Sequence, residues 1–501
     1  MDALIRILVI GCGPHATHFY LPSLYRMAGR GEGVAVAGVL DLSTNREFVL
    51  GELADRGFPC KAMFVEPFEG NDLSEEARQL LEGLVDSGEV NAVIVSTDPL
   101  HHRCYASWAI ARGLPLLMDK PVTTRADAAL DLSQADGIER DYEDLLAEYL
   151  ARPEPRAPFV LCAHRRYHPG ILEARRIVSD VCAQTGCPVT NIACAHADGQ
   201  FRLPHEICTQ RHHSYNQGHG KISHSGFHFI DCIAEFWRDG LRASGKSADD
   251  VEVFSSFVRP DGFSRQLSRE DYRRLFGKAA YEAACPENDM VIAERYRACG
   301  ELDADCVLTM RKDGIPFSMA SLCLLHDSYS RRGWLKPDRD LYKGNGRVKH
   351  EDHSIQVGPF LNLRIQSYQS KDKHDVCLPE TDELPGGNNH FELLIFRNDN
   401  LIGGKSFEKF RLRELGCAKD FDCGTLFITQ VKERSIAEWL AAIRKPGTLD
   451  TSLLSAFTDH RMGVRLMSAI YRSYAKRRTG ASPVEIVPWI GSSTVKTEAR
   501  T

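Results

Sequence analysis

Residues 5–16 read IRILVIGCGPHA, and this stretch decides the fold of the N-terminal part of the chain. Its opening run is rich in β-branched side chains and nearly continuous in apolarity, which predicts a strand buried on both faces of a parallel sheet. Glycines end the strand, and apolar residues at helical spacing follow over residues 15–27. A second strand is expected over residues 34–40, after the glycine-rich break at 29–33. The chain therefore opens with a βαβ unit.

The turn between this strand and helix has the pattern G-x-G-x-x-A, formed by Gly11, Gly13 and Ala16. Small residues there let backbone amides and the helix dipole approach a pyrophosphate, so we expect Gly11, Gly13, His15 and Ala16 to bind a dinucleotide. Asp41 ends the second strand, where a carboxylate accepts hydrogen bonds from ribose hydroxyls and repels a 2′-phosphate. This favours NAD over NADP. The alternative is a tight turn that binds no ligand.

The pattern of the chain changes after its first third. Strands and helices alternate up to residue 118, and a charged helix then leads into Pro153, Pro155 and Pro158, as in a connection between domains. Runs with period-two character follow helices in the later part of the chain. We predict an α/β protein with an N-terminal Rossmann dinucleotide-binding domain and a C-terminal α+β domain with a mainly antiparallel sheet. The predicted bounds are residues 1–155, 156–490 and, for a flexible tail, 491–501.

The composition excludes several classes of function. A chain of 501 residues, 43% hydrophobic and 26% charged, is that of a folded globular protein. The net charge of −6 and the absence of a concentrated basic segment argue against a nucleic-acid partner. The 16 cysteines include no C-x-x-C pair, and the N-terminal apolar run is too short to cross a bilayer. We expect a cytoplasmic protein with reduced thiols and no membrane partner.

Residues 93–102 read VIVSTDPLHH, and a turn Asp119-Lys120-Pro121 follows the next predicted strand. This order resembles the Gfo/Idh/MocA oxidoreductases, the family of glucose-fructose oxidoreductase and inositol dehydrogenase. The resemblance implies that Lys120 points its ammonium between nicotinamide and substrate, and that Thr97 and His102 lie along the cofactor. A lysine at the carboxyl end of a parallel strand can also lower the pKa of a substrate hydroxyl. The alternative for Lys120 is a solvated turn residue.

This segment departs from the family's pattern at two places. Asp98-Pro99 stands where the family has Pro-Asn, and Asp119 stands where it has Glu. Both changes leave the Lys-Pro pair intact.

Residues 218–231 read GHGKISHSGFHFID and are similar to the family's glycine-rich stretch that ends in a catalytic histidine. The resemblance makes His228 the general acid/base and places His224 where the family usually has aspartate. On a helix, His224, His228 and Asp231 share one face, so we expect one face to pack and the other to react. Lys221 and Asp231 are expected to contact the substrate. The alternative for His224 is a histidine that only caps or packs the helix start.

A metal ion and a second substrate contact are further possibilities in this part of the chain. Histidines occur at 205, 212, 213, 219, 224 and 228. Paired histidines can bind zinc, but the H-E-x-x-H pattern is absent and we predict no metal ion. Arg166 and Tyr167 are similar to the family's arginine-rich segment and are expected to meet substrate hydroxyls or an anionic group. A solvated strand end is the alternative.

The predicted function is NAD-dependent hydride transfer to or from a secondary alcohol of a sugar, cyclitol or sugar derivative. Lys120, His228 and His224 are the predicted catalytic residues, and we expect a homo-oligomer with a small polyol or sugar substrate. Two alternatives stay open: a redox-neutral NAD-using epimerase or glycosidase-type enzyme of the same family, and a non-catalytic dinucleotide-binding sensor. The sequence does not identify the substrate, and it reveals no chemistry for the extra segments at 240–300 and 330–420.

Overall fold

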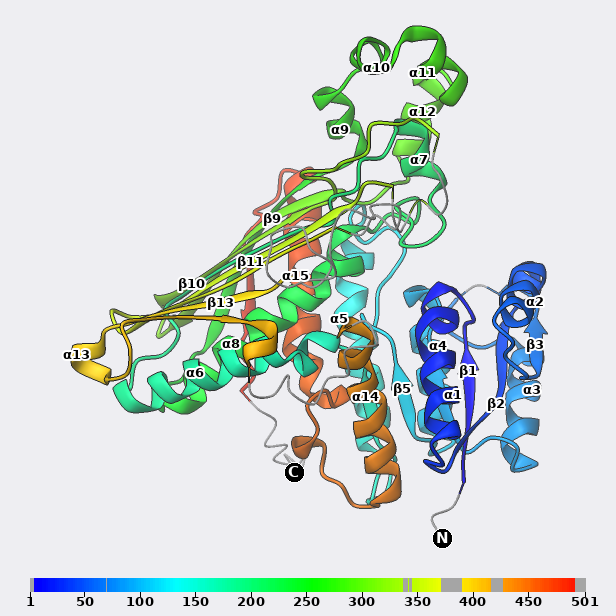
Figure 1. Cartoon of the computed structure of the whole chain (residues 1–501), viewed down its shortest axis with the longest axis horizontal. Helices are drawn as coiled ribbons and strands as arrows, with labels where there is room; N and C mark the ends of the chain where they lie inside the picture. The colour runs from blue at the N-terminus through cyan, green and yellow to red at the C-terminus, as the bar shows by residue number, and fades with distance from the viewer. Residues whose placement is uncertain are drawn as a thin grey trace. The chain divides into compact units, whose positions relative to one another are not determined.

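The computed structural model describes residues 4–68, 70–336, 341, 345–370, 390–415 and 427–491, so most of the predicted tail at 491–501 lies outside the described residues. The chain divides into two compact units (Figure 1). Unit 1 comprises residues 1–124, 139–167 and 422–461, and unit 2 comprises residues 125–138, 168–421 and 462–501. Helix α5 (Leu132–Leu150) contributes residues to both units.

Unit 1 contains a six-stranded parallel sheet in the order β3-β2-β1-β4-β5-β6. The strands are β1 (Ile5–Ile10), β2 (Val34–Leu42), β3 (Ala62–Val65), β4 (Ala92–Val95), β5 (Leu116–Met118) and β6 (Phe159–Leu161). Successive strands run outward from β1 on one side and from β4 on the other, so the topological switch point lies between β1 and β4. Ligands bind such sheets at the carboxyl ends of the strands beside this point. The predicted Rossmann architecture is confirmed.

Helices connect these strands, and the apolar spacing at residues 15–27 predicts the first of them. They are α1 (Leu21–Gly29), α2 (Arg46–Asp55), α3 (Glu75–Asp86) and α4 (His102–Ala111). A π-helical segment, Ala16–Tyr20, precedes α1, and its buried Phe19 and Tyr20 face the core. Such π-helical turns are often found at functional sites.

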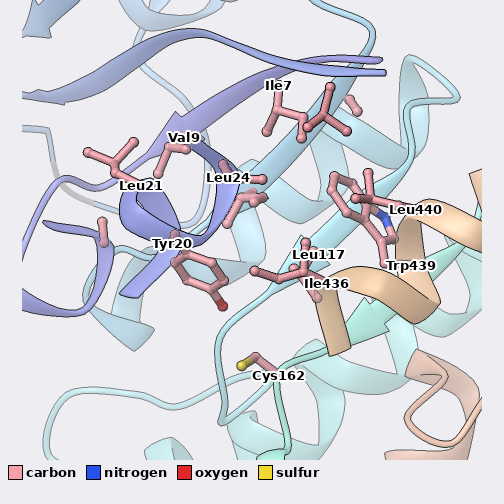
Figure 2. Packing of buried hydrophobic residues seen from close by; sticks show 14 of the residues in the cluster. Ile7, Val9, Tyr20, Leu21, Leu24, Leu117, Cys162, Ile436, Trp439 and Leu440 are labelled. Carbon is pink, nitrogen blue, oxygen red and sulfur yellow. The ribbon is translucent and has the colours of Figure 1, made fainter. Parts of the chain in front are cut away.

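A helix from far along the chain completes unit 1. Ile436, Trp439 and Leu440 of α14 (Phe427–Arg444) are fully buried in one apolar cluster with Leu117 and Cys162 (Figure 2). Burying side chains of this size stabilises a fold by about 2–3 kcal/mol each. The sequence patterns did not predict this return of α14, nor that β6, which follows the expected boundary at 155/156, pairs with β5.

Unit 2 contains a nine-stranded sheet in the order β14-β13-β12-β11-β7-β10-β9-β8-β15. Its pairs are antiparallel except for the parallel pair of β7 and β10. The strands are β7 (Asn191–Ala197), β8 (Asp250–Val258), β9 (Asp303–Lys312), β10 (Ile315–Leu325), β11 (Val348–Val357), β12 (Leu361–Ser370), β13 (Glu392–Arg397), β14 (Phe407–Arg411) and β15 (Glu485–Pro488). The mainly antiparallel second sheet is confirmed.

Helices α6 (Pro169–Thr185), α8 (Phe227–Ser244) and α15 (Arg461–Arg478) pack on one face of this sheet (Figure 1). The Ser255 hydroxyl of β8 donates a hydrogen bond to the Ile470 carbonyl of α15 over 2.7 Å. The His196 ring of β7 stacks on Phe229 of α8 with 4.4 Å between ring centroids. Among the described residues, we find no helix long and apolar enough to cross a membrane.

Short helices in unit 2 form a separate small core. Tyr272, Tyr281 and Tyr296 are buried in it together with Leu203 and Ile292. These helices are α7 (Pro204–Thr209), α9 (Pro260–Gln266), α10 (Arg269–Phe276), α11 (Lys278–Ala284) and α12 (Asp289–Tyr296), while α13 (Asp399–Ile402) lies between β13 and β14. Much of the extra segment at 240–300 thus forms this helical cluster.

Candidate functional site

The glycine turn lies at the carboxyl end of β1, beside the switch point of the parallel sheet. Gly11 has φ +86°, and a Cβ there would lie 2.5 Å from the Ser96 carbonyl oxygen and 2.6 Å from the Thr97 nitrogen. Glycine is therefore required at position 11 by the fold itself. At Gly13, by contrast, no atom of the described residues lies within 4 Å of an added Cβ. The space over Gly13 remains open to a ligand, which is what a pyrophosphate on a helix N-terminus needs.

Asp41 lies in β2 beside this turn, as the sequence predicts for the ribose-binding carboxylate. Its Oδ2 accepts a hydrogen bond from the Cys12 backbone N–H over 2.6 Å, and its Oδ1 accepts from Leu42 N–H and the Asn45 amide over 2.7 and 2.8 Å. Each carboxylate oxygen can accept more than one hydrogen bond. Asp41 therefore braces the glycine turn and retains acceptor capacity for a ribose hydroxyl.

Asp119, directly before Lys120, is the centre of a hydrogen-bonded network. His15 Nδ1, the Tyr20 hydroxyl and the Ser96 hydroxyl lie 2.8, 2.6 and 2.7 Å from its carboxylate oxygens. Burial alone would raise the pKa of Asp119, but the electrostatic attraction of the His15 ring, followed by the hydrogen bonds from His15, Tyr20 and Ser96, holds it well below its usual range. The network joins the carboxyl ends of β1, β4 and β5.

Lys432 of α14 extends this network, and the sequence reasoning missed it. Its Nζ lies 2.8 Å from His15 Nε2 and 5.1 Å from the centre of the Phe19 ring. Burial lowers the pKa of the Lys432 ammonium, although Cys162 and Asp119 oppose that effect. A separation of 417 residues between His15 and Lys432 leaves no local pattern that could have revealed the contact.

The other predicted cofactor residues of unit 1 differ in exposure. Lys120 and Thr97 are half-buried, whereas His102 is fully buried. His102 Nδ1 donates to the Pro121 carbonyl over 2.7 Å, and burial lowers the pKa of its ring. A neutral His102 therefore anchors the turn that carries Lys120. Ala16 is fully buried in the core and contributes only its small size and its backbone.

Arg166 and Tyr167 are buried against the C-terminal part of unit 1. Arg166 donates to the Leu454 and Asp459 carbonyls over 3.1 and 3.3 Å. The Tyr167 hydroxyl donates to the Glu438 carboxylate of α14 over 2.6 Å. These contacts hold α14 and the segment after it in place, so the polar groups of both residues have structural partners.

In unit 2, Lys221 is fully buried in an ion-pair cluster. Its Nζ lies 2.5 Å from Asp198 Oδ2 and 3.1 Å from His196 Nδ1, and Asp198 Oδ1 accepts from Arg347 over 2.7 Å. Burial lowers the pKa of Lys221 to about 8, against the opposing effect of Asp198. The two cations hold the pKa of Asp198 well below its usual range despite its burial. Lys221 is thus already paired with Asp198 within the protein, and its contact with the substrate stays a prediction.

His224 lies in a π-helical segment, Ile222–Gly226, that runs into α8. Its ring centroid lies 4.9 Å from that of His213 and 5.3 Å from those of Tyr215 and His219. His224 is thus part of an aromatic cluster. Among the described residues, we find no group of three or more His, Cys, Asp or Glu side chains that could hold a metal ion.

His228 and Asp231 follow on α8, where the sequence predicts one packing face and one reacting face. In the structure, every residue from Phe227 to Trp237 is buried, with His228 6% and Asp231 1% exposed. Contacts of α8 with α6, β7 and β10 of the same unit account for part of this burial, and the reacting face stays a prediction.

A buried carboxyl beside this segment was also missed by sequence reasoning. Glu301 Oε1 accepts hydrogen bonds from the Ile222 backbone and the Tyr471 hydroxyl, each over 2.8 Å, and Tyr471 also contacts the Ser223 hydroxyl over 2.8 Å. Burial raises the pKa of Glu301 to about 7. This carboxyl changes its charge near neutral pH at the start of the segment that carries His224 and His228.

Comparison with known protein families supports the assignment of the first unit. Residues 5–164 match the GFO_IDH_MocA model, described as an oxidoreductase family with an NAD-binding Rossmann fold. A 136-residue segment is 28% identical to inositol 2-dehydrogenase of Arthrobacter sp. (strain FB24), covering 27% of this chain and 34% of that protein. The same figures hold for inositol 2-dehydrogenase of Pseudarthrobacter chlorophenolicus. The match thus spans about a third of the length of these curated relatives.

Solved structures resemble the chain over nearly its whole length. The aldose-aldose oxidoreductase of Caulobacter crescentus, complexed with glycerol, has a TM-score of 0.54 at 14% identity and covers 97% of this chain and 100% of that one. A 3-ketoreductase of Actinomadura kijaniata, complexed with NADP and TDP-benzene, has a TM-score of 0.53 at 15% identity and covers 96% and 98%. At this identity the likeness shows a shared fold.

Proposed function

We propose that this chain is a nicotinamide-dependent oxidoreductase acting on a secondary alcohol of a sugar, cyclitol or sugar derivative, since its residues 5–164 match the Gfo/Idh/MocA oxidoreductase family with its NAD-binding Rossmann fold. The observation that carries the proposal is the glycine turn. Its space over Gly13 is open, and it lies at the switch point of a parallel sheet, where dinucleotides bind. Inositol 2-dehydrogenases among the relatives and a glycerol-bound structural neighbour support the substrate class.

The described residues of unit 1 fit such a cofactor. Backbone amides of the glycine turn would hold the pyrophosphate, and Asp41 would accept from the adenosine ribose. We propose NAD over NADP because a 2′-phosphate beside the Asp41 carboxylate would bring like charges together, at about one to a few kcal/mol. Relatives of known structure include complexes with each cofactor, so the preference depends on this residue.

A bound nicotinamide would supply the hydride acceptor or donor of the proposed reaction. The Lys120 ammonium polarises the substrate oxygen, and His228 takes the hydroxyl proton as the hydride leaves the same carbon. An imidazole has an ordinary pKa suited to this exchange near neutral pH. His15 contacts Asp119 on one side of Lys120 and His102 contacts Pro121 on the other, and these two contacts keep the lysine at the carboxyl end of β5.

The test compares Lys120→Ala and His228→Ala with the wild type and with Lys445→Ala, a change at an exposed lysine. Polyols and sugars are screened for NADH formation, and NAD affinity is measured by calorimetry. We expect both site variants to lose about a hundredfold or more in turnover while NAD affinity changes little. Turnover that survives both changes would contradict the proposed roles. NAD binding without any turnover, in the wild type as well, would favour the sensor alternative.

A further inference from the structure

The His15–Asp119 contact fixes the proton arrangement of the glycine turn. Asp119 is a carboxylate, so it can only accept, and His15 Nδ1 must donate to it across 2.8 Å. The other ring nitrogen of His15, Nε2, faces Lys432 Nζ at 2.8 Å. An ammonium can only donate, so in this arrangement Nε2 accepts and the His15 ring is neutral.

The only other arrangement would place the shared proton on His15 and leave Lys432 as a neutral amine. The ordinary pKa of a lysine ammonium lies about four units above that of an imidazole, and this difference favours the proton on Lys432. A protonated His15 beside a charged Lys432 would place two cations within hydrogen-bonding distance. In the favoured arrangement the two groups carry one positive charge between them, on Lys432.

From this geometry we propose that Lys432 is a positioning residue of the cofactor site, which keeps His15 neutral and donating to Asp119 across the neutral pH range. The inference rests on the proposed function for its role in cofactor binding, but not for its test on His15 itself. Helix α14 follows more than 250 residues of unit 2 in the chain. By this proposal it contributes a residue to the cofactor site as well as apolar side chains to the core of unit 1. The charge of the glycine turn then does not vary with pH where the enzyme works.

The charged and titratable groups that face His15 come from each element around it. Asp119 lies at the end of β5, Tyr20 is in the π-helical segment, and Lys432 is on α14. Cys162, after β6, lies close enough to Lys432 to influence it electrostatically, but burial and Asp119 raise the pKa of its thiol, so it stays protonated. Of these groups, Lys432 is the cation in contact with His15 Nε2, and it is therefore the group to vary.

The test follows the ring of His15 by NMR in the full chain labelled at histidine, with His15→Gln to assign the signal. We expect His15 not to titrate between about pH 5.5 and 8 in the wild type, and to titrate there in Lys432→Met, because a carboxylate alone stabilises an imidazolium. Lys432→Arg keeps the charge and should restore the wild-type behaviour. Lys445→Met, an exposed lysine just after α14, is the matched control and should change nothing.

A parallel measurement of the NAD dissociation constant at pH 6 and pH 8 tests the role in the site. We expect a ratio near one in the wild type and in Lys432→Arg, and a change of about threefold or more in Lys432→Met, since a titrating charge then lies on the turn. A wild-type His15 that titrates normally would overturn the inference even if Lys432→Met failed to fold, as would a Lys432→Arg variant that does not restore the wild-type profile. Failure of the wild type to bind either nicotinamide cofactor would overturn the proposed function, while the His15 titration would still decide the inference.

Discussion

Gly11→Ala and Gly13→Ala are changes of the same size, two residues apart, with opposite expected effects. At Gly11 the new Cβ would lie 2.5 Å from the Ser96 carbonyl oxygen, a backbone atom that cannot rotate away, and the residue has φ +86°. A non-glycine residue with positive φ costs about 1–2 kcal/mol, and forced overpacking costs about 1–3 kcal/mol. We expect Gly11→Ala to destabilise unit 1 by about 2–5 kcal/mol.

At Gly13 the added methyl group meets no described atom within 4 Å and the backbone is outside the left-handed region, so the fold should be unaffected. The methyl group would instead occupy the space that we assign to the pyrophosphate. We expect Gly13→Ala to weaken NAD binding by about tenfold or more, or about 1.4 kcal/mol.

The assay is thermal unfolding of the cofactor-depleted protein together with calorimetric titration of NAD. A loss of about 2–5 kcal/mol lowers Tm by roughly 5–15 °C in a unit of this size, so Gly11→Ala should unfold early and Gly13→Ala should match the wild type. Equal losses of Tm in both variants, or unchanged NAD affinity in Gly13→Ala, would refute the reasoning.

Three further changes test other parts of the account. Asp41→Asn removes a charge and keeps the shape, so it should shift the ratio of NAD to NADP affinity toward NADP by about fivefold or more in calorimetric titrations; an unchanged ratio would remove Asp41 from cofactor selection. Tyr167→Phe removes the hydroxyl that donates to the half-buried Glu438 over 2.6 Å, so denaturation should show a loss of about 1–3 kcal/mol. If the hydroxyl acts only in this contact, kcat/KM should be unchanged, whereas a selective loss of kcat/KM would support the predicted substrate contact of Tyr167. Burial raises the pKa of Glu301 from 4.5 to about 7, so the unfolded state releases this proton at lower pH than the folded state does. The free energy of unfolding should therefore fall by up to about 3 kcal/mol between pH 4.5 and 7. Glu301→Gln should flatten that pH dependence in urea titrations, and an equally steep dependence in the variant would contradict the raised pKa.

Local patterns predicted the elements whose partners are close in sequence. The apolar run at 5–10 and the glycines after it specify a buried strand and a turn, and both are present. The helix that carries His228 follows from its apolar spacing. These features depend on neighbouring residues, so a single sequence is enough to predict them.

Contacts between distant segments could not be predicted in the same way. Nothing in the spacing of 427–444 shows that this helix belongs to unit 1, because an amphipathic helix does not specify its partner. The pairing of Arg166 with the Leu454 carbonyl and of Lys432 with His15 depends on that docking. The burial of α8 likewise depends on distant segments, among them α6, β7 and β10.

The most direct test of the central claim is single-turnover absorbance at the NADH band, with the purified protein, NAD and a panel of sugars and cyclitols. We expect the absorbance to rise with at least one secondary alcohol, and to rise only transiently if the enzyme is redox-neutral. This rise should be lost in Lys120→Ala and His228→Ala proteins that still bind NAD. Absorbance changes that persist unchanged in both variants, or no NADH with any alcohol although NAD binds, would contradict it.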